Sequence, residues 1–330
     1  RLEDEIAKTG EPKYRAKQLF KWFARGVTSF DEMSDLSKPL REKLSERFGL
    51  SSVEIERCFA SEVDETKKYL LRLSDGNIIE SVAMKYKHGI SVCISTQVGC
   101  LMGCRFCAST LGGKVRNLTP GEILGQVAAL QRELGERVSN IVLMGIGEPL
   151  DNFENVIVFL KNVNNPDGMN IGYRHISLST CGISDRIYEL AKQNMPITLS
   201  VSLHAPNDEI RSRIMPVNKK YPVAMLIEAC REYVKTTNRR ISFEYILIDG
   251  INDRIETADE LASLLRNMQC HVNLIPANFV LECGLSKSSP ENIAAFKKRL
   301  EQRHITVTIR RELGQDIEAS CGQLRQRHNS

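Results

Sequence analysis

The sequence predicts an α/β protein with a partial (β/α)6 barrel, a small N-terminal helical domain and a β-rich connector. Six short apolar runs alternate with helical patterns over residues 91–310, which is typical of a parallel sheet. Residues 1–50 instead place apolar side chains at helical spacing. The length, 330 residues, accommodates one large domain or two ordinary ones.

The first segment, residues 1–50, is expected to form a small helical accessory domain. Its clearest helical face follows i, i+3, i+4, i+7 spacing and consists of Ala16, Leu19, Phe20 and Phe23. A neighbouring stripe of basic residues consists of Lys13, Lys17 and Lys21. For this stripe a solvated surface is favoured over an RNA contact.

Residues 51–90 are expected to form the β-rich connector. Asp75 and Gly76 read as a hairpin turn between the apolar runs 69–73 and 78–80.

The barrel is predicted over residues 91–310. Its strands are expected at 91–96, 141–145, 175–179, 197–203, 241–248 and 272–276, with a final strand at 305–310. Helices are expected at 121–134, 155–163 and 257–268. A polar tail, residues 311–330, follows and carries Cys321. Active-site residues of such a barrel gather at the C-terminal ends of its strands.

Composition narrows the class of protein. The chain is 42% hydrophobic and 26% charged, which excludes a disordered protein. No apolar run approaches the ~18 residues of a membrane helix, and the N-terminus is charged where a signal peptide is apolar. We therefore expect a cytoplasmic protein. In such a protein the ten cysteines are expected to serve as metal ligands or catalytic thiols rather than to form structural disulfides. The net charge of +4 is too small to indicate a nucleic-acid binder by itself.

Three cysteines give the sharpest signal. Cys100, Cys104 and Cys107 form a C-x3-C-x2-C motif after the first barrel strand. Three thiolates at this spacing can hold three irons of a cubane cluster and leave the fourth iron open. Zinc with a distant fourth cysteine is the alternative, since a structural zinc site needs four ligands.

The surroundings of this motif are basic. No acidic residue occurs between Glu80 and Glu122, an interval of 41 residues. The basic residues inside it are Lys85, Lys87, Arg105, Lys114 and Arg116. Their field would favour an anionic cluster or a polyanionic substrate.

Other predicted strands end in polar residues. The second strand is followed by a glycine turn that can present Glu148 to an ammonium group, although a plain turn is the alternative. A dinucleotide-binding fingerprint fails here because Leu150 stands where it requires glycine. The next two strands end at 177–180 and 200–207, where hydroxyls and the His204 imidazole can bond a ribose and a carboxylate.

These motifs resemble a known family. C-x3-C-x2-C after the first strand resembles the signature of radical S-adenosylmethionine (SAM) enzymes. The stretches QVGC, GIGEPL, VSLHAPND, MPVNKKYP, NLIP and DIEASCGQL are similar to those of the RlmN/Cfr adenine methyltransferases, with the RlmN branch nearest. The likeness runs from about residue 10 to residue 325.

The resemblance implies the cofactors and their ligands. One [4Fe-4S] cluster would be held by Cys100, Cys104 and Cys107, and two SAM molecules would be used per turnover. The implied SAM contacts are Gly147, Glu148, Ser179, Ser202, Leu203, His204 and Asn278. The chain departs from the family pattern at Ile146, Phe279 and Ser320, and the loop 279–287 with Cys283 is the least typical region.

The resemblance also implies a relay of two further cysteines. Cys321 takes a methyl group from one SAM and becomes S-methylcysteine. A radical generated from a second SAM activates this methyl for addition to an adenine carbon. Cys93 then forms a transient disulfide with Cys321 and releases the product, while Glu80 accepts the proton. A structural role is expected for Cys58, Cys181, Cys230, Cys270 and Cys283.

The implied reaction is methylation of C-2 of an adenine in 23S rRNA, at the peptidyl transferase centre, and in tRNA, next to the anticodon. An electron donor such as flavodoxin and a monomeric state are expected with it. One alternative is the Cfr branch, which methylates C-8 and confers antibiotic resistance. An alternative of another class is a non-catalytic iron–sulfur or zinc RNA-binding protein.

Overall fold

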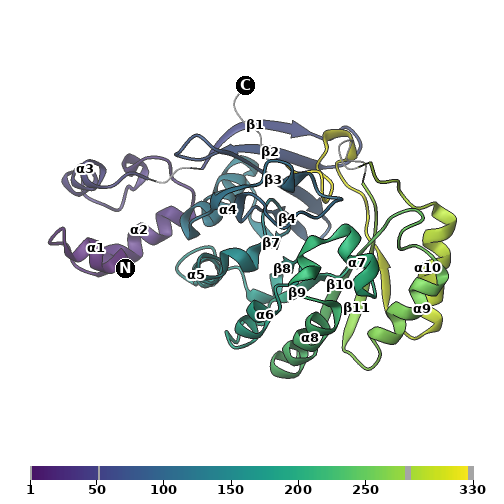
Figure 1. The fold of residues 1–330 in the computed structure, drawn as a ribbon. Helices are drawn as coiled ribbons and strands as arrows, with labels where there is room; N and C mark the ends of the chain where they lie inside the picture. Colours follow the sequence, from purple (N-terminus) through teal and green to yellow (C-terminus); the bar gives the residue numbers. More distant parts are fainter. Residues whose placement is uncertain (1, 51–52, 279–283, 326–330) are drawn as a thin grey trace.

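A ten-stranded sheet forms the centre of the computed structural model, which describes residues 2–50, 53–278 and 284–325 (Figure 1). Six strands pair in chain order and are all parallel: β4 (Gly89–Cys93), β7 (Val138–Leu143), β8 (Ile176–Thr180), β9 (Thr198–Ser202), β10 (Ile241–Leu247) and β11 (Cys270–Pro276). β12 (Val307–Ile309) adds a further parallel strand beside β11. The predicted partial barrel is therefore confirmed.

The connector continues this sheet. β1 (Glu54–Ala60), β2 (Thr66–Arg72) and β3 (Ile78–Tyr86) form an antiparallel meander, and β3 pairs with β4 of the barrel. The turn between β2 and β3 falls at the predicted place. Gly76 adopts a φ of 83°, which favours glycine, and Asp75 Oδ1 accepts a hydrogen bond from the Asn77 N–H at 3.1 Å.

Helices alternate with the parallel strands and cover the sheet (Figure 1). They are α4 (Pro120–Leu134), α5 (Phe153–Asn164), α6 (Ser184–Ala191), α7 (Asp208–Ile214), α8 (Val223–Thr237), α9 (Ile255–Leu264) and α10 (Pro290–Gln302). Each of these helices buries apolar side chains; α5, for example, buries Val156, Phe159 and Leu160. Within the described part of the chain, no helix has the length and hydropathy needed to cross a bilayer.

The N-terminal helices lie at one end of the molecule beside α4 (Figure 1). They are α1 (Leu2–Ala7), α2 (Tyr14–Ala24) and α3 (Lys38–Arg47), and they share a separate small apolar core. The basic stripe on α2 is exposed, as expected. Two of its lysines also face an acid of the barrel, because Asp167 lies 2.9 Å from Lys17 Nζ and 3.9 Å from Lys21 Nζ.

Candidate active site

The cysteine triplet lies on a small hairpin of its own. The predicted strand 91–96 ends early, at Cys93, and the chain then forms β5 (Gln97–Gly99) and β6 (Lys114–Asn117), which pair with each other as a two-stranded antiparallel sheet. The segment between them, which we call the cluster loop, covers residues 100–113. Its backbone is tied at the first cysteine, where the Cys100 N–H donates to Gly113 O at 2.8 Å.

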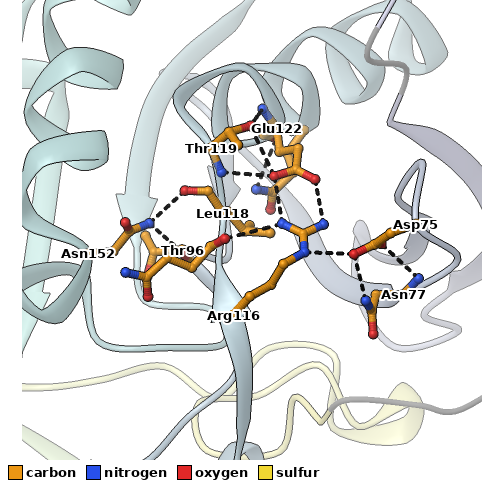
Figure 2. Close-up of polar contacts among 10 residues, drawn as sticks. Asp75, Asn77, Thr96, Arg116, Leu118, Thr119, Glu122 and Asn152 are labelled. Atoms are coloured by element: carbon orange, nitrogen blue, oxygen red, sulfur yellow. Dashed lines mark hydrogen bonds and ion pairs between the residues drawn. The ribbon is translucent and has the colours of Figure 1, made fainter.

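An ion-pair anchor fixes this hairpin to the rest of the protein (Figure 2). Arg116 on β6 binds the Glu122 carboxylate through both terminal nitrogens, at 2.9 and 2.7 Å, and binds Asp75 through Nε at 2.7 Å. Burial alone would raise the pKa of Glu122, but the Arg116 guanidinium and the first turn of α4 lower it below its usual value. The Asn152 amide adds two bonds of 2.8 Å to the carbonyls flanking the hairpin (Figure 2).

The basic interval around the triplet is partly neutralised in three dimensions. Three of its five cations pair with acids from outside the interval: Lys85 with Glu136, Lys114 with Asp151, and Arg116 with Glu122 and Asp75. The remaining two, Lys87 and Arg105, are exposed. The predicted positive field is therefore weaker than the sequence interval suggests.

Most of the predicted site residues line a single cavity of about 150 Å³. They come from the cluster loop, from the C-terminal ends of the barrel strands and from the tail: Cys100, Cys104, Cys107, Gly147, Glu148, Ser179, Ser202, His204 and Cys321. Four others do not line it: Glu80, Cys93, Leu203 and Asn278. The barrel thus gathers the residues where the fold class predicts.

The turn after β7 presents a carboxylate to this cavity. Gly147 has a φ of 103°, and a Cβ at this position would lie 2.6 Å from Gln97 Cβ, so only glycine fits. The Glu148 oxygens accept hydrogen bonds from the N–H groups of Leu150, at 2.9 Å, and Cys181, at 2.7 Å. Burial raises the pKa of Glu148. A cationic ligand in the cavity would offset the cost of burying this carboxylate.

His204, which lines the cavity, and Asn278, which contacts Cys321 beside it, offer further polar atoms. His204 Nδ1 accepts from the Ile246 N–H at 3.0 Å, so a neutral ring carries its proton on Nε2. Burial, followed by the charge of Arg211, lowers the pKa of His204 to about 3 and keeps it neutral. Asn278 donates to Cys321 O at 2.8 Å, while its Oδ1 is buried without a hydrogen-bond partner among the described residues. A ligand donor would satisfy this orphaned acceptor.

The C-terminal tail reaches the cavity from the opposite end of the chain. Cys321 and Gly322 line it directly. Two hydrogen bonds join the tail to the cluster loop: the Ala108 N–H donates to Gly322 O at 2.7 Å, and Ser109 Oγ donates to Leu324 O at 2.6 Å. The thiol predicted to carry the methyl group is therefore held beside the cysteine triplet.

The two remaining residues of the predicted relay lie under this tail. Cys93 ends β4 and is buried in an apolar cluster with Leu324. Burial, and then the charge of Cys321, raises the pKa of Cys93 to about 12. Glu80 on β3 is fully buried, and its carboxylate accepts from the Arg325 N–H at 3.3 Å. The thiols of Cys93 and Cys321 are both free.

Sequence reasoning missed a charged pair in the same cavity. Arg310 follows β12 and places Nη1 3.7 Å from the Glu244 carboxylate and 3.6 Å from Met144 Sδ. The pKa of Arg310 is raised, first by the charge of Cys321 and also by Cys93. The only signal in the sequence was position, since both residues of the pair lie on, or directly after, the last strands of the barrel.

The arrangement of the donors fits an iron–sulfur cluster better than zinc. Among the residues described, no three Cys, His, Asp or Glu side chains are grouped to hold a single metal ion. Zinc would require four ligands within about 2.3 Å of one point. A cubane cluster instead takes each cysteine on a different iron, so the thiols can stand farther apart.

Comparison with known proteins identifies the class first. Residues 94–262 match the model of the radical SAM superfamily. A crystal structure of a radical SAM methyltransferase from Sphaerobacter thermophilus superimposes with a TM-score of 0.94 at 45% identity, covering 98% of this chain and 96% of that one. The chain therefore belongs to the radical SAM enzymes, a superfamily whose members use a [4Fe-4S] cluster and SAM.

The family within this class is also shown. Residues 1–50 match a ribosomal RNA large subunit methyltransferase N-terminal domain. A probable dual-specificity RNA methyltransferase RlmN of Desulforamulus reducens is 55% identical over 330 residues, which are 100% of this chain and 94% of that protein. The protein of the same description from Clostridium novyi is 53% identical over 328 residues, covering 99% and 96%. The chain belongs to the RlmN family, and the resemblance found in its motifs is confirmed.

Proposed function

We propose that this chain methylates C-2 of an adenine in 23S rRNA, at the peptidyl transferase centre, and in tRNA, next to the anticodon. The observation that carries the proposal is the shared cavity, in which the tail thiol of Cys321 meets the cysteine triplet. The relatives' description as dual-specificity RNA methyltransferases supports two kinds of RNA substrate.

Cys100, Cys104 and Cys107 would hold the cluster, and Glu148 would bind the ammonium group of SAM. When bound, the cluster and SAM supply a 5′-deoxyadenosyl radical able to abstract hydrogen from a methyl group. The backbone N–H groups of Leu150 and Cys181, which donate to Glu148, fix the orientation of its carboxylate before SAM binds. His204 and Asn278 offer a neutral donor and an unpartnered acceptor for the polar groups of SAM.

Cys321 acts as the methyl carrier in this proposal. A ring carbon such as C-2 of adenine is electrophilic, so direct methyl transfer from SAM finds no nucleophile there. A cysteine thiolate is a good nucleophile and can take the methyl from a first SAM. Hydrogen abstraction then requires a second SAM, which gives the two molecules per turnover. Arg310 and Cys321 line the same cavity, and the charge of Cys321 raises the pKa of Arg310.

Release of the product requires a bond from Cys321 to carbon to be broken. Before release, the adduct must lose one electron, for which the oxidised cluster would be the acceptor, and the proton of the ring carbon, which goes to Glu80. The Cys93 thiolate then attacks the sulfur of Cys321 and a disulfide forms. The electron pair of the broken carbon–sulfur bond stays with the transferred carbon, which takes up a proton and becomes the methyl group. The position of both residues beneath residues 324 and 325 supports their action on a substrate held by the tail.

Residues 1–50 would bind RNA, with residues 51–90 as connector, residues 91–310 as barrel and residues 311–330 as methyl-carrying tail. A one-electron donor such as flavodoxin would reduce the cluster, and we expect a monomer. The match of residues 1–50 to an N-terminal domain of ribosomal RNA methyltransferases supports the first assignment.

Mass spectrometry of nucleosides tests the reaction. Ribosomal RNA and tRNA are isolated from cells with and without the gene and digested, and methylated adenosines are separated by liquid chromatography. We expect 2-methyladenosine in both RNAs only where the gene is present. 8-methyladenosine would move the chain to the C-8 branch, and the absence of both products would overturn the proposed reaction.

A further inference from the structure

Arg211 on α7 is a buried cation without a carboxylate partner. Its side chain is completely buried. Every hydrogen bond recorded for its guanidinium goes to a neutral acceptor: the carbonyls of Cys181 (2.6 Å), Leu203 (3.0 Å), Ser202 (3.1 Å) and Tyr221 (3.4 Å), and Asn218 Oδ1 (3.0 Å). In the described part of the chain, no Asp or Glu oxygen lies within ion-pair distance of it.

This arrangement is unfavourable for the protein taken alone. Burial lowers the pKa of Arg211, but a guanidinium stays protonated at any pH at which proteins fold. Neutral acceptors satisfy its N–H groups without cancelling its charge. A buried charge of this kind usually has a counter-charge close by. Arg211 is therefore a positive charge in the protein interior that lacks a counter-charge among the described residues.

Arg211 lies on α7 three residues before Ile214, where this helix meets the cluster loop. The end of α7 is bonded to that loop, because the Arg105 N–H donates to Ile214 O at 2.9 Å. Cys104 and Cys181 pack with Ile214 in one apolar cluster, and their thiols, when ionised, would raise the pKa of Arg211. Both Arg211 and the cluster ligand Cys104 are buried, so their interaction is weakly screened.

We propose that Arg211 is the internal counter-charge of the iron–sulfur cluster and raises its reduction potential. The inference rests on the proposed cluster site at Cys100, Cys104 and Cys107. Three thiolates outweigh the charge of a [4Fe-4S]²⁺ core, so the bound cluster is anionic, and one added electron makes it more so. A fixed cation nearby stabilises the reduced form more than the oxidised form. Arg211 acts through the cluster and is a positioning residue.

A redox titration of the reconstituted protein tests the proposal. The cluster is reduced stepwise with dithionite, whose sulfur dioxide radical anion supplies one electron per cluster, and the [4Fe-4S]¹⁺ signal is followed by electron paramagnetic resonance. We expect Arg211→Gln to lower the reduction equilibrium constant at least tenfold, which is about 59 mV for one electron. Arg211→Lys keeps the charge and should lie nearer to the wild type. Equal shifts in both variants, or none in Arg211→Gln, would overturn the proposal.

A variant of opposite sign covers the case in which Arg211→Gln does not fold or takes up no cluster. Asp208 is the acid whose charge acts on Arg211, and Asp208→Asn keeps the Oδ1 that accepts from Asn218 at 2.9 Å. Loss of this acid should raise the reduction potential of the cluster. The increase should be smaller than the decrease that Arg211→Gln causes. An unchanged or lower potential in Asp208→Asn would then decide against the proposal.

A matched control separates the local charge from net charge. Arg299 on α10 is ion-paired with Asp259 at 2.8 Å, and Arg299→Gln removes the same charge there. Its potential should equal that of the wild type. A wild-type protein that binds no cluster would contradict the proposed cluster site, whereas a bound cluster with a potential insensitive to Arg211 would contradict this inference alone.

Discussion

The cluster loop and the C-terminal tail meet in one cavity, but they are held in different ways. The loop sits on a paired hairpin that the buried Glu122 carboxylate and Arg116 anchor. Within the described residues, the tail forms one short 3-10 turn, η7 (Gln315–Ile317), and reaches the loop through two hydrogen bonds. It meets the connector through exposed bonds, such as those of Asp316 with Ser61 and Glu62. Segments with few buried contacts open at lower free energy than packed ones.

This difference matches the two tasks. Cluster ligands must keep a fixed geometry through every turnover. In the proposed reaction the thiol of Cys321, in contrast, meets SAM, the RNA base and Cys93 in turn, so the segment that carries it has to move between these partners. The predictions below test whether the tail supplies chemistry and the loop supplies support.

The largest effect is expected from Cys321→Ala. Without this thiol no methyl group can be carried, so formation of 2-methyladenosine should be abolished in a reconstituted assay. Iron content should be unchanged, because Cys321 is outside the ligand triplet. Cys270→Ala alters a cysteine of β11 outside the cavity, and this variant should retain both methylation activity and iron content. Methylation by Cys321→Ala would contradict the relay.

The step that uses Cys93 should depend strongly on pH. Because burial raises the pKa of Cys93 to about 12, its reactive thiolate is scarce at neutral pH and grows about tenfold per pH unit below that value. RNA release from the Cys321 adduct, followed in single-turnover experiments from pH 7 to pH 9, should accelerate accordingly. Cys93→Ala should trap the covalent protein–RNA adduct at every pH. A flat profile, or release by Cys93→Ala, would exclude Cys93 as the attacking group.

Glu122→Gln should weaken the support of the loop without touching the cavity. The variant removes the charge that binds Arg116 and should destabilise the fold by about 1–3 kcal/mol, since a buried hydrogen-bonded ion pair is broken. Denaturant unfolding measures the free energy, and iron analysis measures cluster retention, which should fall with it. Glu232→Gln, which alters the exposed i,i+3 pair with Lys235, is the control and should change neither.

The smallest effect is expected from Ser109→Ala. It removes one of the two hydrogen bonds that join loop and tail, so the free energy of unfolding should fall by about 1 kcal/mol or less. Hydrogen exchange should nevertheless rise selectively at the tail amides. Ser263→Ala removes a similar bond on α9 and should leave tail exchange unchanged. Protection that stays the same in Ser109→Ala would mean that this bond does not hold the tail.

Periodicity and motifs predicted the elements well, because both reflect local chemistry. Strands β7 to β12 lie within a few residues of their predicted positions, since buried parallel strands are continuous apolar runs. The clearest boundary errors are at 91–96, where the strand ends at Cys93, and at 257–268, where the helix ends at Leu264. The residues beyond Cys93 are also buried and apolar in part, so their change of direction into the β5 hairpin left no mark in the pattern. The predicted departures at residues 279–283 lie outside the described residues.

The positive field around the cysteine triplet was the prediction that the structure supported least. The acid-free interval suggested a positive field, but Asp75, Glu122, Glu136 and Asp151 return to it from elsewhere in the chain. Arg211 and Arg310 were invisible for the same reason. The role of each of these arginines depends on the charged groups around it, and the sequence does not show which residues are neighbours in space.

The sequence by itself determined the barrel, the cysteine triplet and the family, because strand periodicity, ligand spacing and long motifs are all written along the chain. The tertiary structure decided which cysteine meets which. It brings Cys321, 214 positions after Cys107, into the same cavity, places Cys93 under the tail, and buries one guanidinium on the helix that meets the loop. Long-range packing alone produces such encounters, since the energy of a charge or a thiol depends on the atoms around it.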